Sequence, residues 1–162
     1  MITQDELKRI FHYEPTTGIF TRLVFINNRL KVGDIATCIN GHGYRVIKIN
    51  SKTYKAHRLA YLYMTGEFPL DQIDHIDGVR INNCWFNLRN ATQSINSQNL
   101  HAPHKDNNSG YIGVSWCKKN KKWRARIKIN NKGLSLGYFA DAKEASESYL
   151  KKKREIHAGC TI

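Results

Sequence analysis

The chain has 162 residues, of which 41% are hydrophobic and 24% charged, and its formal net charge is +13 at pH 7. Such a basic chain favours a polyanionic partner over a membrane surface, because no long helix with a strongly apolar face is evident. No apolar run approaches the ~20 residues that a membrane span needs. The N-terminal residues lack the basic and apolar regions of a signal peptide. We therefore expect a cytoplasmic protein without a targeting segment.

The positive charge is uneven along the chain. Residues 1–100 carry 12 Lys/Arg and 8 Asp/Glu, whereas residues 101–162 carry 14 and 5. None of the four cysteines forms a close pair with another, which excludes a zinc knuckle or a redox motif and favours free thiols: Cys38, Cys84, Cys117 and Cys160.

Residues 1–56 are predicted to be a β-rich region that contacts DNA. A capping box at residues 3–6 predicts a short helix to about His12. Strands are expected at residues 19–26, 35–39, 44–49 and 54–56, with a hairpin turn at residues 41–43. Basic residues follow this sheet, and they fit a face that contacts DNA or an ordinary solvated face equally well.

Residues 57–66 read as a short helix with an apolar side, and Gly66 ends it. Arg58, at its start, is a candidate phosphate contact. His57 is interpreted as a structural histidine.

The central stretch carries the chemistry. Asp74 and His75 end a short apolar run, and a polar loop follows. Residues 87–89 form a second extended piece, and Thr92 can cap a helix that carries Asn96. A strand, loop, strand and helix can close on themselves, which would bring Asp74 towards Asn96. Two oxygen ligands beside a histidine fit a hard cation and a general base.

Phosphodiester hydrolysis requires these residue types. A neutral histidine can take a proton from water near pH 7, and one divalent ion can bind a phosphate oxygen and the leaving oxygen together. The alternative is that Asp74 and His75 are a polar pair beside a turn and that the asparagines are loop residues.

The stretch resembles the HNH endonuclease family, which has the ββα-metal fold, and within it the phage homing endonucleases. The resemblance rests on residues 74–78, Asn82 and Asn83, residues 87–89, and Asn96. It implies that His75 is the general base, that Asn87 orients His75, and that Asp74 and Asn96 hold one Mg²⁺ or Mn²⁺. It further implies products with a 5′ phosphate and a 3′ hydroxyl, made in a bacterial or phage-infected cell.

Residues 101–109 are polar, contain a proline and are expected to be a linker. Strands are predicted at residues 111–116, 123–129 and 134–139, with turns at 118–122 and 130–133, and a capping box at Asp141 opens a helix to about His157. In the second strand, apolar side chains alternate with Arg124, Arg126 and Lys128, so one helix can cover the apolar side and leave the basic side bare.

Residues 110–159 resemble the AP2/ERF DNA-binding domain in element order, in residues 113–114, 123–127 and 136–139, and in the Ala-rich helix. The resemblance implies a three-stranded sheet in the major groove with DNA-facing positions at Ser115, Cys117, Arg126, Lys128 and Ser135. When the basic residues Arg58, Arg89 and Arg124 are added to positions from this set, the expected DNA contacts are Arg58, Arg89, Ser115, Arg124, Arg126, Lys128 and Ser135.

The sequence thus predicts an α+β protein with a small N-terminal antiparallel sheet, a central ββα-metal unit at residues 57–100, and a C-terminal three-stranded sheet packed on one helix. The predicted function is a metal-dependent DNA endonuclease of the HNH homing type, a monomer on double-stranded DNA without a protein partner. The alternative is a DNA-binding transcriptional regulator with an inactive HNH unit. An RNA-binding protein fits less well, because no exposed aromatic stacking pair is evident.

Overall fold

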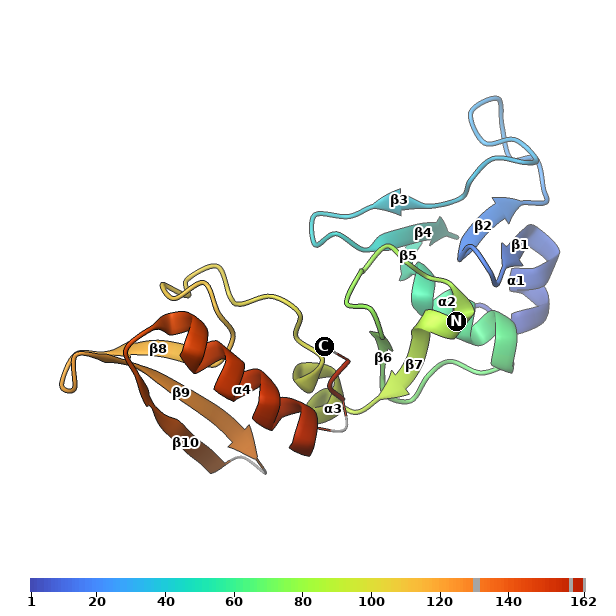
Figure 1. Ribbon diagram of the computed structural model, residues 1–162. Coiled ribbons are helices and arrows are strands. Elements are labelled where there is room, and N and C mark those ends of the chain that lie inside the picture. Colours follow the sequence, from blue (N-terminus) through green and yellow to red (C-terminus); the bar gives the residue numbers. More distant parts are fainter. Residues whose placement is uncertain (130–131, 158, 162) are drawn as a thin grey trace. The chain divides into compact units, whose positions relative to one another are not determined.

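The structure, a computed structural model, describes residues 1–129, 132–157 and 159–161. The chain divides into a first unit, Met1–Gln93, and a second unit, Ser94–Ile162, and each is described by itself (Figure 1). Several small antiparallel sheets and short helices confirm the α+β class. Among the described residues, no helix has the length and apolarity needed to cross a membrane.

The first unit opens with helix α1 (Gln4–Ile10), followed by the antiparallel strands β1 (Phe11–Glu14) and β2 (Ile19–Arg22). The predicted cap is confirmed, because the Thr3 hydroxyl accepts a hydrogen bond from the Glu6 N–H. The helix is shorter than predicted. Phe11 and Tyr13 alternate with exposed His12 and are buried, so this segment forms a strand.

The predicted strand at residues 19–26 ends early, at Arg22. The N–H groups of Arg22 and Leu23 bond to the carbonyls of Asp34 and Ile10, and the chain then leaves the sheet. It returns at the short strand β3 (Cys38–Ile39). Residues 23–26 are apolar, but among the described residues no strand pairs with them, and an apolar run forms a strand only where it finds a partner.

A second sheet has the order β3-β4-β5, with β4 (Arg45–Ile49) in the centre and β5 (Lys52–Lys55) at the edge. The predicted hairpin turn is confirmed by the bond from the Gly43 N–H to the Asn40 carbonyl. Helix α2 (Ala56–Thr65) follows directly and ends at Gly66, which has the expected left-handed backbone with φ of 88°.

The remaining elements of the first unit are strand β6 (Gln72–His75), the 3₁₀ turn η1 (Trp85–Asn87) and strand β7 (Leu88–Ala91), which pairs with β6. One core joins α1, β1, β2, β4, α2, β6 and β7. Its buried side chains come from both sides of the expected boundary at residue 56: Leu7, Phe11, Tyr13, Phe20, Ile47, Leu59, Ile73 and Leu88. Residues 1–56 are therefore not a separate packing region, because their apolar faces are covered by α2, β6 and β7.

Helix α3 (Gln93–Gln98) begins at the last residue of the first unit and continues into the second. The expected boundary near residue 100 is therefore earlier. Within the second unit, the Gln98 side chain accepts a bond from the Gly159 N–H, and the Lys153 ammonium donates to the Leu100 carbonyl. These contacts join the end of α3 and the segment after it to the C-terminal part of the chain, so this segment belongs to the second unit.

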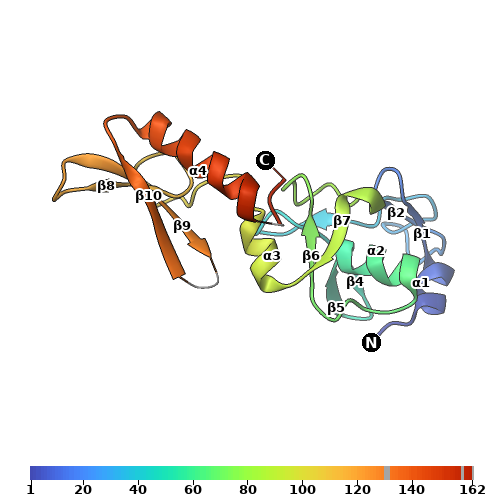
Figure 2. The same cartoon turned by 60° about the horizontal axis from the view of Figure 1, so that its bottom comes forward.

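The second unit contains strands β8 (Val114–Cys117), β9 (Lys122–Ile129) and β10 (Lys132–Phe139), in the order β10-β9-β8, and helix α4 (Ala142–Ile156). Figure 2 shows α4 along the sheet, and its Ala145 and Tyr149 pack with Ala125 and Ile127 of β9. The Asp141 carboxylate caps α4, as predicted. Residues 130 and 131 of the predicted turn lie outside the described residues, and the four cysteines are free thiols.

We predict that Gly18→Ala destabilises the first unit by about 2–4 kcal/mol. Gly18 has φ of +70°, and an added Cβ would lie 2.3 Å from the carbonyl carbon of Asn83. Gly43→Ala is the matched control, because φ is +78° there and no described atom lies within 4 Å of its Cβ position; it should cost only the strain, about 1–2 kcal/mol. Urea unfolding measures both, and equal losses would contradict the close packing of Gly18 on Asn83.

Candidate active site

His75 lies at the end of β6, where the strand pairing places it opposite Leu88 of β7. Its side chain is buried, with 5% of the residue exposed. The ring Nε2 lies 3.0 Å from the amide oxygen of Asn83. With the amide in this orientation, Nε2 carries the proton and donates it, so the lone pair of the neutral ring is on Nδ1.

Asn83 is itself held by residues far away in sequence. It is 1% exposed, and its backbone carbonyl accepts a 2.7 Å bond from the Tyr13 hydroxyl of β1. The β1–β2 turn lies against the same segment, since the Trp85 N–H bonds to the Pro15 carbonyl and the Cys84 thiol bonds to the Thr16 carbonyl. The N-terminal hairpin therefore fixes the residue that contacts His75.

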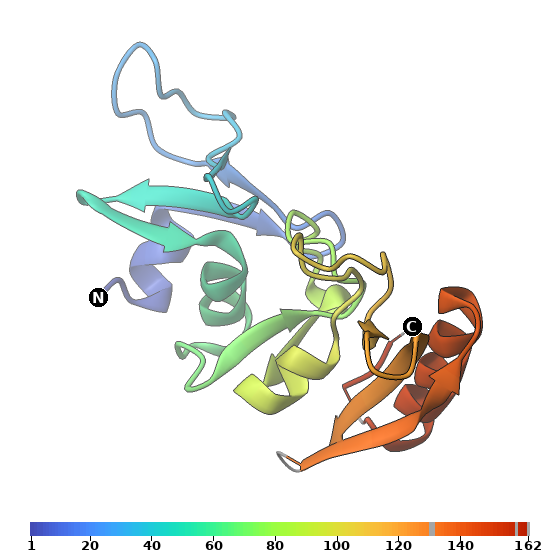
Figure 3. The same cartoon turned by 90° about the vertical axis from the view of Figure 1, so that its left-hand side faces the viewer.

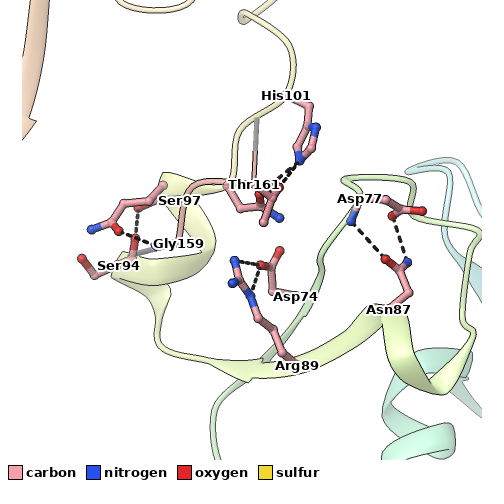
Figure 4. Close-up of polar contacts among 11 residues, drawn as sticks. Asp74, Asp77, Asn87, Arg89, Ser94, Ser97, His101, Gly159 and Thr161 are labelled. Carbon is pink, nitrogen blue, oxygen red and sulfur yellow. Dashed lines mark hydrogen bonds and ion pairs between the residues drawn. The ribbon is translucent and has the colours of Figure 1, made fainter. Parts of the chain in front are cut away.

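The imidazole of His75 contacts the amide oxygen of Asn83, and the expected role of Asn87 in orienting His75 stays a prediction. The Asn87 amide instead closes the loop after β6, because it accepts from the Asp77 N–H and donates to the Asp77 carboxylate and the Asn82 carbonyl (Figure 4). The resemblance to the HNH family had implied Asn87 as the residue that orients His75, and Asn83 entered only as part of the pair Asn82 and Asn83.

Two aromatic rings pack against His75. The His57 ring of α2 meets it edge-on, with centroids 5.0 Å apart, and Tyr44 lies 6.2 Å from His75 and 5.4 Å from His57. His57 is 4% exposed, and among the described residues its Nδ1 has no hydrogen-bond partner. The contact agrees with its interpretation as a structural histidine.

Burial sets the protonation state of both histidines. It lowers the pKa of His57 to about 3, and the nearby His75, Lys55 and Arg58 act in the same direction. Burial also lowers the pKa of His75, although the bond to Asn83 and the carboxylates of Asp77 and Asp74 oppose this effect. Both rings are therefore neutral near pH 7, the state in which His75 can accept a proton.

The loop after β6 is fixed by a carboxylate. Partial burial of Asp77 would raise its pKa, but hydrogen bonds from the Val79 N–H, Asn82 and Asn87 outweigh it and lower the pKa. The ionised Asp77 thus holds the turn that connects His75 to Asn83.

Asp74 points to a different set of contacts. Its Oδ2 accepts bonds of 2.9 Å and 2.8 Å from Nε and Nη2 of Arg89, directly across the strand pair (Figure 4). Asp74 is 5% exposed. Arg89, expected on DNA, therefore has a role inside the protein, because a buried carboxylate needs a partner for its charge.

Arg58 is likewise used inside the protein. Its two terminal nitrogens donate to the carbonyls of Asp71 and Pro69, at 3.0 Å and 2.9 Å, and hold the turn that leads into β6. These bonds give Arg58 a structural role, and its expected contact with a phosphate stays a prediction. The carbonyls of an irregular segment need donors, and Arg58 supplies them.

Asn96 lies on α3, in the second unit, whereas Asp74 lies in the first. Their predicted approach therefore stays a prediction. The start of α3 is tied to β6, because the Gln72 amide bonds to the Gln93 amide oxygen. In the described parts of the chain, no three His, Cys, Asp or Glu side chains gather as metal ligands.

The second unit presents a basic strand face. Arg126 and Lys128 of β9 are exposed, as are Ser115 and Ser135 on the neighbouring strands, whereas Arg124 is half-buried. The Arg126 guanidinium lies across Gly133, where a Cβ would come within 2.1 Å of it. Arg126, Ile127, Lys128 and Gly133 line a hollow of about 390 Å³. The predicted alternation of β9 is thus confirmed, with Ala125 and Ile127 buried.

Residues 54–98 match the sequence profile of the HNH endonuclease family. Protein 3.8 of Escherichia phage T7 is 36% identical over 85 residues, which are 52% of this chain and 69% of that protein. This chain belongs to the HNH endonuclease family. The structure is also similar to a solved structure that describes DNA binding and cleavage by the HNH homing endonuclease I-HmuI. The TM-score is 0.43 and the identity 23%, and the match covers 93% of this chain and 88% of that one. His75, Asp74, Asn83 and Asn87 of this HNH endonuclease all lie within the matched residues.

We predict that burial of neutral His57 makes the first unit less stable in acid. His57 has an ordinary pKa of 6.5 when unfolded and about 3 when folded. Between these values the unfolded chain binds more protons, so the free energy of unfolding falls as pH is lowered from 6.5 towards 3, by up to about 1.4 kcal/mol per pH unit from this group.

Urea unfolding, followed by tryptophan fluorescence across this pH range, measures the effect. His57→Leu should remove this part of the slope, whereas His42→Leu, at an exposed position, should retain it. The same slope in His57→Leu as in the unchanged chain would mean that His57 is not held neutral.

Proposed function

We propose that this HNH endonuclease hydrolyses phosphodiester bonds of double-stranded DNA, with His75 as the general base. One observation carries the proposal: within the family match, a buried and neutral His75 is held by Asn83 in a defined orientation, beside the carboxylate of Asp74. Unlike the buried His57, which is interpreted as structural, His75 combines burial with an oriented ring beside a carboxylate, and a general base needs a defined tautomer and a neutral ring at the working pH.

In the proposed mechanism, the bond to Asn83 keeps the proton on Nε2, so Nδ1 takes a proton from water. The hydroxide oxygen attacks phosphorus, the bond from phosphorus to the 3′ oxygen breaks, and the departing 3′ oxygen takes a proton from solvent water. The products are a 5′ phosphate and a 3′ hydroxyl. His75 becomes an imidazolium, which the carboxylates of Asp77 and Asp74 stabilise and the nearby Arg80 opposes.

The donor groups that Asp74 and Asn96 carry are of the type that a divalent ion prefers. Asp74 offers a carboxylate and Asn96 an amide oxygen, and Mg²⁺ or Mn²⁺ takes such hard ligands together with phosphate oxygens. We propose that these two residues hold one ion, while Arg89 fixes Oδ2 and thereby the orientation of the carboxylate. When bound, the ion would neutralise charge on the phosphate and on the leaving oxygen.

We further propose that the second unit is an AP2/ERF-like module that grips DNA through the exposed face of β9. Support comes from the order of its elements and from Arg126, Lys128, Ser115 and Ser135 on exposed positions of one sheet. Arg124 lies on the same strand and is half-buried. Much of the site preference of a homing-type enzyme would then come from this unit.

The second candidate is a DNA-binding regulator whose HNH unit is inactive. The basic face of β9 supports DNA binding in either case. The buried contact between His75 and Asn83 favours the nuclease, because a regulator has no use for an oriented neutral base.

We predict that His75→Ala loses roughly 10²–10⁴ in cleavage rate and keeps its DNA affinity, because this residue moves a proton and need not hold DNA. The measurement is single-turnover nicking of supercoiled plasmid with Mg²⁺ or Mn²⁺, and without either ion, alongside filter binding in EDTA. His42→Ala is the control for an exposed histidine in the same unit. Cleavage by His75→Ala at the rate of the unchanged chain would refute the assignment, and no cleavage by the unchanged chain with either ion would favour the regulator.

Two residues of β9 should differ in their effect on DNA recognition. If Arg126 reads a guanine, Arg126→Ala should relax the preference at one or two base pairs, at a cost of about 1–3 kcal/mol. If Lys128 holds a phosphate, Lys128→Ala should weaken binding to all sequences and make the salt slope shallower by about one unit. Selection from a randomised duplex pool at fixed salt tests both, and unchanged stringency in Arg126→Ala would remove the base-reading role.

A further inference from the structure

A finger of the chain, residues 23–35, projects from the first unit between β2 and β3 (Figure 3). Its base is fixed to β2. The Arg22 N–H donates to the Asp34 carbonyl, the Gly33 N–H donates to the Arg22 carbonyl, and the Ala36 N–H donates to the Phe20 carbonyl. Its tip is a tight turn in which the Ile26 N–H bonds to the Leu30 carbonyl and the Arg29 N–H bonds to the Asn27 side chain. The finger is therefore held at both ends by hydrogen bonds.

The finger exposes large apolar side chains. Between 47% and 61% of each of five such residues is accessible: Leu23, Phe25, Ile26, Val32 and Ile35. Single exposed apolar residues are ordinary, but a cluster within one short segment marks a contact surface. Phe25 and Ile26 stand directly before the turn at the tip, where a partner would meet them first.

Charge indicates the partner. Residues 15–66 contain eight Lys or Arg and one acidic residue, Asp34. The Asp34 carboxylate is used within the finger, since it accepts a bond from the Lys31 N–H. Arg29 and Lys31 lie in the finger beside the apolar side chains. The finger thus presents apolar side chains together with two basic ones, and this combination fits duplex DNA, in which the apolar base stack lies behind an anionic backbone.

We propose that the finger enters the minor groove of duplex DNA and inserts Phe25 or Ile26 between base pairs, while Arg29 and Lys31 contact the flanking phosphates. Apolar wedges of this kind partly unstack a base step and bend the duplex by roughly 20–90°. Ordering of the finger before binding reduces the entropic cost of insertion. The inference rests on DNA as the partner in the proposed function, but it does not depend on cleavage.

The test measures bending of a duplex of about 40 base pairs with a central TA step, labelled with a donor and an acceptor dye at its two ends. The full chain is added in EDTA, so that cleavage does not enter the result. Phe25→Ser and Ile26→Ser are compared with Leu70→Ser, which removes a side chain that is 100% exposed in the same unit but outside the finger. A 2-aminopurine base at the central step reports unstacking.

The unchanged chain and Leu70→Ser should bend the duplex and raise the 2-aminopurine fluorescence. Phe25→Ser and Ile26→Ser should bend the duplex less and bind it roughly tenfold more weakly, because less apolar surface is buried on binding. Their salt slope should stay unchanged because an apolar contact releases no counterions, whereas Lys31→Ala should make it shallower by about one unit.

Equal bending and affinity in all four chains would overturn the inference. So would a self-association of the protein without DNA, seen by sedimentation, that Phe25→Ser abolishes, because the finger would then contact a second copy. A chain that nicks plasmid but does not bend the duplex would refute the insertion of Phe25 or Ile26 and leave the proposed nuclease activity intact. A chain that bends the duplex but never nicks plasmid would support the wedge and contradict the proposed nuclease activity.

Discussion

The hydrogen bond between His75 and Asn83 is the contact on which the rest of the first unit depends. A histidine can serve as a general base only if its tautomer and its neutral state are both fixed. The amide oxygen at 3.0 Å from Nε2 fixes the tautomer, and burial beside His57 and Tyr44 favours the neutral ring. The rings exclude water from one side, and the amide supplies the polar partner that a buried imidazole needs.

This constraint explains why the N-terminal hairpin shares a core with the HNH elements. Asn83 lies in an irregular segment, which has no strand ladder to hold its backbone. Tyr13, 70 residues earlier, bonds to its carbonyl, and Gly18 packs so closely on it that a side chain there would clash. The clamp formed by Asp77 and Asn87 fixes the same loop from the other end. The position of the candidate base is thus set by long-range packing as much as by the motif.

The sequence predicted the features that depend on local patterns. The capping residues Thr3 and Asp141, the stop at Gly66 and the alternation of β9 all involve neighbouring residues, and all are confirmed. The partners of side chains were less predictable. Asn83 and Asn87 look equivalent along the chain, and only the hairpin shows which one is buried beside His75. Arg58 and Arg89 were expected to contact DNA, and no local pattern indicated that Arg58 also holds two carbonyls and that Arg89 pairs with a buried carboxylate.

The most direct test is the tautomer of His75, measured by long-range ¹H–¹⁵N correlation NMR on the full chain with ¹⁵N-labelled histidine at about pH 7. His75→Gln assigns its signals among the seven histidines. A neutral ring with the proton on Nε2, lost or mixed with the other tautomer in Asn83→Leu, is the result that we expect. A proton on Nδ1, or a spectrum of His75 that Asn83→Leu leaves unchanged, would contradict the role of Asn83 in orienting the base.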